Sequence, residues 1–142
     1  MQSVFILAAL AASSFAQRLI IQEPTAGQTI TGNAPVTIEV SRSVPPTPET
    51  QGTVVIAVTP CYDVCSQPPL WPASQVVYDG PLNVQYNNSD PAKGRYEDIT
   101  VTVPSFFQSS GAIISVAHQF TSESASGNTP LFEYTDVLVN IQ

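Results

Sequence analysis

Positive charge is scarce in this sequence. Four Lys and Arg residues stand against eleven Asp and Glu residues, which gives a formal net charge of −7 at pH 7. Nucleic acids and anionic membrane surfaces both attract proteins through basic patches. We therefore expect neither a nucleic acid nor a membrane among the partners of this protein.

Long apolar runs are also missing, except near the N-terminus. The run over residues 4–12 is too short to span a bilayer, which takes about 20 residues. Ser14-Phe15-Ala16 then places small residues where a signal peptidase cleaves. We predict a signal peptide over residues 1–16 and a single secreted, extracellular domain over residues 17–142; a buried N-terminal strand is the alternative.

Cysteine is rare, and the two cysteines, Cys61 and Cys65, lie close together. Secretion favours a disulfide between them. Four extended steps would separate them by about 13 Å, whereas the Cα atoms of a disulfide lie within about 7 Å. The predicted Cys61–Cys65 disulfide therefore needs a turn and would mainly shape a loop. A redox role is disfavoured because the spacing is not Cys-x-x-Cys.

Groups for catalysis are few. The chain has one histidine, His118, and no Gly-x-Ser-x-Gly motif. A metal site normally needs several ligands within reach. We expect His118 to be a core residue, or to lie exposed at the end of a strand, rather than to be catalytic or to bind a metal.

The carboxylates do not form an obvious catalytic pair. Adjacent Glu97 and Asp98 point to opposite faces of a strand, so they cannot flank a cleft as glycosidase carboxylates do. Two further pairs are Glu133 with Asp136 and Asp79 with Asp90. The loop around Asp90 lacks the EF-hand pattern for calcium. We interpret these acids as solvated surface residues and predict no enzymatic activity, no metal and no cofactor.

Helical periodicity is absent, and strand periodicity takes its place. In the stretch 96–120, Ile99, Val101 and Val103 alternate with polar residues, as in a strand with one buried face. Residues 53–59 and 112–117 are apolar almost throughout, which indicates central strands. Shorter alternating segments occur at 18–22, 36–40, 74–78, 82–86 and 132–141. This pattern predicts an all-β, immunoglobulin- or fibronectin-III-like β-sandwich of about seven or eight strands.

Turn-forming residues predict the connections. We expect a proline-rich loop over residues 43–52, a strand end at Pro60, an irregular loop over 60–73 and a turn at Asp79-Gly80-Pro81. Residues 121–130, rich in Ser, Gly and Asn, are predicted to form another loop. The pattern after it suggests a change of phase near Thr135, as a β-bulge would produce.

The loop 60–73 contains the best candidates for recognition. Trp71 lies between prolines, next to Leu70, and Tyr62 lies in the cysteine turn. A rigid loop that presents a large aromatic side chain is typical of interfaces and sugar-binding platforms. We predict Leu70, Trp71 and Tyr62 as binding residues; the alternative is that Trp71 folds back onto the sandwich. Asn87-Asn88-Ser89 is an N-glycosylation motif, with Asn87 as the acceptor.

Several segments together resemble a known group of proteins. They are Tyr78-Asp79-Gly80-Pro81-Leu82-Asn83, Asp98-Ile99-Thr100-Val101-Thr102-Val103-Pro104, Val116-Ala117-His118, Phe132-Glu133-Tyr134 and Val137-Leu138-Val139. In this combination the chain resembles small secreted fungal proteins related to the necrosis-inducing secreted effector family. The resemblance implies a compact secreted β-protein that binds immune-receptor-associated kinases of a plant host and blunts pattern-triggered immunity. It implies no catalytic residues.

Two functional hypotheses follow from the sequence. The first is a secreted, monomeric, non-enzymatic protein that acts through protein–protein contacts at a fungus–host boundary. The alternative is a structural module that binds a polysaccharide of the cell wall. A hydrolase with an unfamiliar site that uses His118 is a third, weaker hypothesis.

Overall fold

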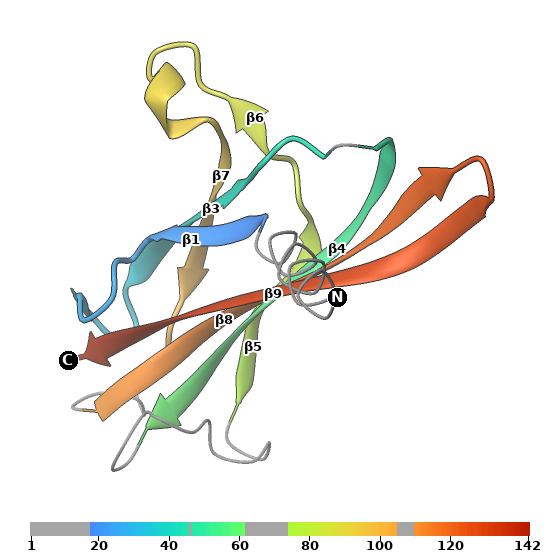
Figure 1. The fold of residues 1–142 in the computed structure, drawn as a ribbon. Coiled ribbons are helices and arrows are strands. Elements are labelled where there is room, and N and C mark those ends of the chain that lie inside the picture. The colour runs from blue at the N-terminus through green and yellow to red at the C-terminus, as the bar shows by residue number, and fades with distance from the viewer. Residues whose placement is uncertain (1–17, 46, 62–73, 105–109) are drawn as a thin grey trace, which may run out of the picture.

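The computed structural model describes residues 18–45, 47–61, 74–104 and 110–142 (Figure 1). This part of the chain is all-β. Its strands are β1 (Leu19–Glu23), β2 (Thr29–Ile30), β3 (Pro35–Arg42), β4 (Glu49–Cys61), β5 (Gln75–Pro81), β6 (Gln85–Tyr86), β7 (Arg95–Thr102), β8 (Ser110–Ser124) and β9 (Gly127–Ile141). A short 3-10 helix at Pro91–Lys93 precedes β7. No helix among the described residues is long and apolar enough to cross a membrane.

The strands form two sheets that enclose the core. One sheet has the order β1-β3-β7-β6, and the other has the order β2-β9-β8-β4-β5. Neighbouring strands are antiparallel, except that the short β2 runs parallel to the end of β9. Figure 1 shows β4, β8 and β9 as the long strands that continue past the other sheet.

The core consists of the inward-facing positions of both sheets, as the alternation predicts. Ile99 and Val101 of β7 and Val103, which follows the end of β7, are all buried. The facing positions of the five-stranded sheet are fully buried aliphatic residues, among them Val54, Ile56, Val58, Ile114 and Val116. Burying one such side chain contributes about 1.5–3 kcal/mol, so this layer supplies the main stabilisation of the fold.

The predicted turn at Asp79-Gly80-Pro81 is wrong. These residues belong to β5 and pair with Thr53–Val55 of β4. The Tyr78 hydroxyl donates a hydrogen bond to the carbonyl oxygen of Pro81, at 3.0 Å. Strand β5 lies at the edge of its sheet and pairs only with β4. Edge strands tolerate Gly and Pro, because no second ladder depends on their backbone groups.

The proline-rich loop is shorter than predicted. Strand β4 already begins at Glu49, and residues 49–51 pair with β8. The register shifts by one residue after Gln51, where a Cβ on Gly52 would lie 2.3 Å from the carbonyl oxygen of Gln119. Only glycine permits this close approach. Pro60 does not end the strand either, since it pairs with Ala112 in a ladder that continues to Cys61.

The predicted loop over residues 121–130 is also wrong. Strands β8 and β9 form one long hairpin, paired without interruption from Ser124 with Gly127 to Ser110 with Ile141. The turn between them contains only Ala125 and Ser126, and the Ser124 hydroxyl donates to the Gly127 carbonyl. Ser, Thr and Asn are accepted in the ladder because this end of the hairpin is largely solvated on both faces.

No bulge occurs near Thr135. The constant register of the hairpin keeps the odd-numbered residues of β9, from Glu133 to Ile141, on the inner face. Phe132 and Tyr134 consequently point outward, the opposite of what a phase change would produce. The unbroken register thus directs Glu133 toward the facing sheet and directs Phe132 and Tyr134 toward the opposite side.

Candidate functional site

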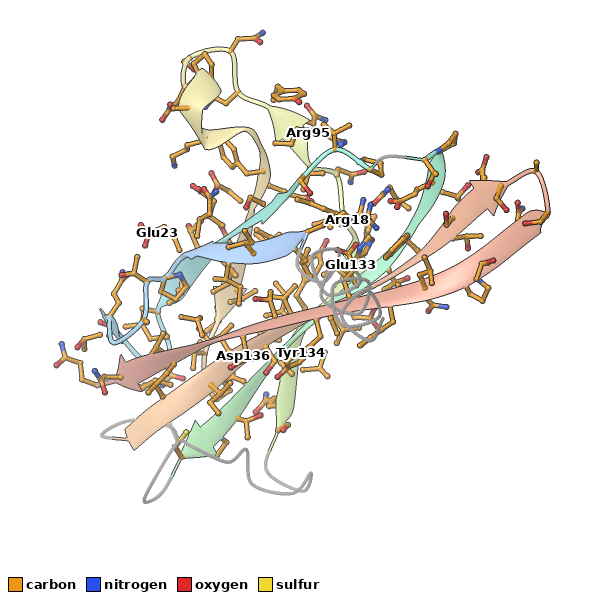
Figure 2. All side chains as sticks on the ribbon, viewed as in Figure 1. Arg18, Glu23, Arg95, Glu133, Tyr134 and Asp136 are labelled. Carbon is orange, nitrogen blue, oxygen red and sulfur yellow. The ribbon has the colours of Figure 1, made fainter. Side chains whose placement is uncertain are left out.

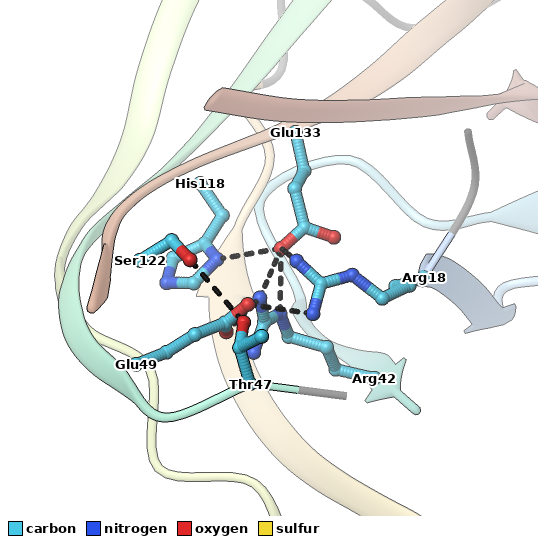
Figure 3. Close-up of polar contacts among 7 residues, drawn as sticks. All are labelled: Arg18, Arg42, Thr47, Glu49, His118, Ser122 and Glu133. Atoms are coloured by element: carbon cyan, nitrogen blue, oxygen red, sulfur yellow. Dashed lines mark hydrogen bonds and ion pairs between the residues drawn. The ribbon is translucent and has the colours of Figure 1, made fainter. Parts of the chain in front are cut away.

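Five ionisable side chains gather between the two sheets where the hairpin leaves the sandwich. They are Arg18, Arg42, Glu49, His118 and Glu133, called here the charged cluster (Figure 3). The alternation of the strands explains their position. Arg42 lies on the inward-facing side of β3, and His118 of β8 pairs with Glu133 of β9 on the inward-facing side of the other sheet. The sequence thus places charges where the core would otherwise continue.

Arg42 is the centre of this cluster. Its Nη2 atom lies 2.6 Å from Glu49 Oε2 and 2.6 Å from Glu133 Oε1, and its Nε atom also donates to Glu133 Oε1. Arg18 Nη1 donates to the other oxygen of Glu49, at 2.6 Å. The Phe120 ring lies 4.6 Å from the Arg42 guanidinium carbon and 5.0 Å from that of Arg18. Two cations therefore balance two carboxylates over an aromatic face, which is what buried charges require.

His118 lies inside the sandwich, which agrees with the first of the two expected positions, a core residue, and not with exposure at the end of a strand. Its side chain is fully buried and stacks on Phe120, with ring centroids 5.5 Å apart. The Nδ1 atom lies 3.4 Å from Glu133 Oε1. Neither His118 Nε2 nor Glu133 Oε2 has a hydrogen-bond partner among the described residues. His118 is thus a core residue whose polar atoms are only partly satisfied.

The charged cluster is largely buried: the side chains of Arg42 and Glu49 are 1% and 2% exposed, and those of Glu133 and Arg18 are 12% and 20% exposed. A surface pocket lined by Glu23, Glu39 and Asp98 lies along the first part of β3, and no residue of the cluster lines it. The described residues contain no group of three or more His, Cys, Asp and Glu side chains that could hold a metal. We interpret the cluster as a connection between the hairpin and the facing sheet.

The cluster holds Glu133 in its charged form. Burial raises the pKa of Glu133, but contacts with His118, Arg42 and Arg18 outweigh burial and leave this pKa below its ordinary value of 4.5. A carboxylate whose folded-state pKa is depressed stabilises the fold above its unfolded-state pKa. That contribution is lost as the pH falls through the folded-state pKa.

Acidification should therefore remove a stability difference between wild type and Glu133→Gln. Wild type is expected to be the more stable protein at neutral pH. Its advantage should shrink between about pH 5 and pH 2, because protonated Glu133 resembles the amide. Melting temperatures of both proteins over this range measure the effect. A difference that stays constant with pH would contradict this role of Glu133.

The outer face of the five-stranded sheet presents large apolar side chains. Phe132, Tyr134 and Leu138 of β9 are 67%, 49% and 42% exposed, and Val76 of β5 is 56% exposed. Figure 2 shows Tyr134 and Asp136 on one side of β9, and Glu133 on the other side with Arg18. Exposed apolar residues gathered on one face mark interaction sites more often than scattered ones do.

The strand register assembles this face across four strands. Cross-strand partners share a face of a sheet, so Tyr134, Ala117 and Val55 form one row. Asp136, Ser115, Ala57 and Val76 form the next row, and the Ser115 and Tyr134 hydroxyls lie 3.1 Å apart. Small side chains thus lie between the aromatic residues of β9 and Val76. We call this surface the outer face.

The outer face is acidic. The same pairing places Asp79, Glu123 and Asp136 on it, and all three are exposed. The four cationic residues of the chain are engaged elsewhere: Arg18 and Arg42 in the charged cluster, Lys93 with Glu39 at 2.7 Å, and Arg95 with the Val84 carbonyl. A partner of the outer face therefore meets negative charge without positive charge beside it.

All three predicted recognition residues, Tyr62, Leu70 and Trp71, lie outside the described part of the chain, so the binding role of the loop stays a prediction. Cys65 also lies outside it, and the Cys61–Cys65 disulfide likewise stays a prediction. Cys61 itself is buried at the end of β4. The predicted signal peptide over residues 1–16 also lies outside it.

The other candidate residues are dispersed. Asn87 is half-buried, donates to the Tyr96 hydroxyl and accepts hydrogen bonds from Ser89, so its glycosylation stays a prediction. Glu97 accepts a hydrogen bond from the backbone of Asn83, whereas Asp98 lines the surface pocket. Asp136 lies on the outer face and Glu133 in the charged cluster.

Sequence reasoning missed the outer face because it assumed a change of phase in the last strand. Without that assumption, a single alternation places Phe132, Tyr134, Asp136 and Leu138 on one side. A strand whose two faces both carry apolar residues was the available signal. It indicates that one face meets the core and that the other presents apolar surface to a partner.

Comparison with known proteins supports the fold and gives no family. Neither the known family models nor the curated proteins contain a match to this sequence. Among solved structures, an entomopoxvirus fusolin matches over 82% of this chain and 38% of its own, with a TM-score of 0.56 and 15% identity. Fusolin from the spindles of a Wiseana entomopoxvirus matches over 83% of this chain and 43% of its own, with a TM-score of 0.53 and 15% identity.

A third fusolin, from Anomala cuprea entomopoxvirus, has a TM-score of 0.51 and 16% identity over 87% of this chain and 47% of its own. This chain spans less than half the length of each of these fusolins. At such low sequence identity the likeness shows the fold alone.

Proposed function

We propose that this protein is a secreted, non-enzymatic binding protein that recognises another protein through the outer face. The observation that carries the proposal is the exposure of Phe132, Tyr134 and Leu138 on one face of one strand. Aromatic residues are enriched among the energetically dominant contacts of interfaces. Secretion rests on the predicted signal over residues 1–16. The setting at a fungus–host boundary rests on the resemblance to secreted fungal effectors.

We also infer an immunoglobulin-like arrangement of the sandwich. Taken in chain order, β1-β3-β7-β6 corresponds to the A-B-E-D sheet of immunoglobulin domains, and β9-β8-β4-β5 corresponds to G-F-C-C′. In this arrangement the outer face is that of the G-F-C-C′ sheet. Strand β4 ends at Cys61 and β5 begins at Gln75, so the segment that contains Leu70 and Trp71 is connected to the sheet at one border of this face. A partner that contacts both is compatible with the predicted role of Leu70 and Trp71.

The double variant Phe132→Ala/Tyr134→Ala tests the proposal. The partner is first isolated on the immobilised secreted protein from extracts of plant tissue, and its affinity is then measured by calorimetry or surface plasmon resonance. We expect the double variant to bind at least about 30-fold more weakly, since each truncated hot-spot residue costs about 1–2 kcal/mol. Tyr86→Ala is the matched control, because Tyr86 is 62% exposed on the other sheet. Equal affinities of the double variant and Tyr86→Ala would refute the proposal.

A cell-wall polysaccharide is the second candidate partner. Two aromatic residues two positions apart on an exposed strand, Phe132 and Tyr134, offer stacking surfaces that a sugar chain could use. Incubation with insoluble chitin and glucan separates the candidates. Retention of wild type but not of Phe132→Ala/Tyr134→Ala supports this second function. Absence of retention leaves protein binding as the proposal.

A further inference from the structure

We propose that the free edge of β9, from Phe132 to Asp136, binds an extended basic segment of the partner protein by adding it to the five-stranded sheet. This inference rests on the proposed function and specifies the chemistry of the partner. Strand addition uses backbone hydrogen bonds for affinity and alternate side chains for selectivity.

Most of β9 has no ladder partner on one side, although β1 of the facing sheet lies close to it. On one side β9 pairs with β8 over its full length. On the other side it pairs with β2 only at Asn140 and Ile141. Strand β1 belongs to the facing sheet, and no backbone hydrogen bond joins it to β9 among the described residues. Residues 127–137 therefore offer an edge without a ladder partner in the described part of the chain.

The hydrogen bonds near the C-terminus show which residues face this edge. The Gly27 amide donates to the Leu138 carbonyl at 2.8 Å, and the Asn140 amide donates to the Gln28 carbonyl at 2.9 Å. Amide and carbonyl groups of one strand residue point to the same neighbour, and successive residues alternate. Even-numbered residues of β9 thus face the open edge, and odd-numbered ones face β8.

Pro130 fits this assignment. It is even-numbered, so its missing amide hydrogen falls on the open side and costs no bond to β8. The next three even positions are Phe132, Tyr134 and Asp136, whose amides and carbonyls are free to pair. Their side chains point to the outer face, so an added strand would meet the aromatic residues on the same side.

Charge selects the occupant. The outer face carries Asp79, Glu123 and Asp136, and each of the four cations of the chain is engaged elsewhere. Only Asp136 lies on β9 itself, since Glu123 belongs to β8 and Asp79 to β5 at the opposite edge of the sheet. A Lys or Arg of an added strand would therefore lie against Asp136, and the other two carboxylates would add a longer-range attraction. A second copy of this chain would instead bring another net charge of −7 to the same surface, so it is disfavoured.

Amide hydrogen exchange tests the inference directly. The probe is a blocked ten-residue peptide that alternates Lys with Val, and the control peptide has Glu in place of every Lys. With the Lys peptide, exchange of the Phe132, Tyr134 and Asp136 amides should slow by about tenfold or more. The Thr135 amide faces β8 and should be protected with and without peptide, which provides an internal control. The Glu peptide should leave all these rates unchanged.

Two variants at one position separate the edge from the outer face. Tyr134→Ala removes only the side chain, whereas Tyr134→Pro also removes the edge donor while sparing the β8 ladder. We expect Tyr134→Pro to bind the Lys peptide about tenfold more weakly than Tyr134→Ala, as the loss of one such bond predicts. Circular dichroism shows whether both variants are folded. If Tyr134→Pro is unfolded, the comparison is repeated with Phe132→Pro and Phe132→Ala.

Three results would overturn the inference. They are equal protection by the Glu peptide, no protection by either peptide, and protection without peptide that grows with protein concentration, which would indicate a second copy. None of these results would contradict the proposed function, because that function is tested separately by the affinity of the isolated partner for Phe132→Ala/Tyr134→Ala.

Discussion

Replacing Arg42 by alanine should lower the free energy of unfolding by about 3–5 kcal/mol. Arg42 is 1% exposed and contacts both carboxylates of the charged cluster. Its removal leaves Arg18 as the remaining arginine beside the carboxylates of Glu49 and Glu133. Two largely buried carboxylates with one arginine between them carry a high desolvation cost. Urea denaturation of both proteins at neutral pH measures the loss.

Lys93→Ala is the matched control for this prediction. Lys93 also pairs with a glutamate, Glu39, but its side chain is 40% exposed. The side chain of Glu39 is only 6% exposed, but the ammonium of Lys93 lies nearer the surface, where water and salt screen the pair more than in the charged cluster. Lys93→Ala should therefore lower the urea midpoint clearly less than Arg42→Ala does. If Arg42→Ala were no more harmful than Lys93→Ala, the charged cluster would not connect the two sheets in the way we describe.

Ile114→Ala should destabilise the protein by about 2–5 kcal/mol. Ile114 is fully buried at the centre of β8, between β4 and β9. Truncation removes buried apolar surface and leaves a cavity that long, tightly paired strands cannot collapse to fill. The midpoint and slope of urea unfolding provide the measurement.

Leu138→Ala provides the comparison, since Leu138 lies on the neighbouring strand of the same hairpin but is 42% exposed on the outer face. We expect its effect on stability to stay within about 0.5 kcal/mol. Similar losses for Ile114→Ala and Leu138→Ala would mean that the outer face is covered in the free protein. That result would contradict the assignment of this face to a partner.

The sequence predicts the fold well where hydrophobic alternation is strong. Ile99, Val101 and Val103 are inward, and the apolar segments 53–59 and 112–117 lie in central strands, because burial fixes the face of each residue. Composition fails where strands leave the core. Residues 121–130 look like a loop but continue the hairpin, since their register is inherited from the buried part of β8 and β9.

The site was less predictable than the fold. Arg42 and Glu133 are 91 residues apart in sequence, and Arg18 and Glu49 are 31 apart, so the charged cluster has no local signal. The inward position of Arg42 can be read from the alternation of β3, but its partners cannot. The outer face could be predicted from sequence only if the alternation of the last strand continued unbroken through Thr135. The candidates Tyr62, Leu70 and Trp71 lie outside the described residues and keep their status as predictions.

The central claim is that the outer face makes the principal contact with a protein partner. The affinity of the isolated partner for Phe132→Ala/Tyr134→Ala, measured beside that for Leu70→Ala/Trp71→Ala, tests it most directly. We expect Phe132→Ala/Tyr134→Ala to reduce the affinity at least about 30-fold, and Leu70→Ala/Trp71→Ala to reduce it by no more than that. If folded Phe132→Ala/Tyr134→Ala bound the partner as tightly as wild type, the central claim would be contradicted.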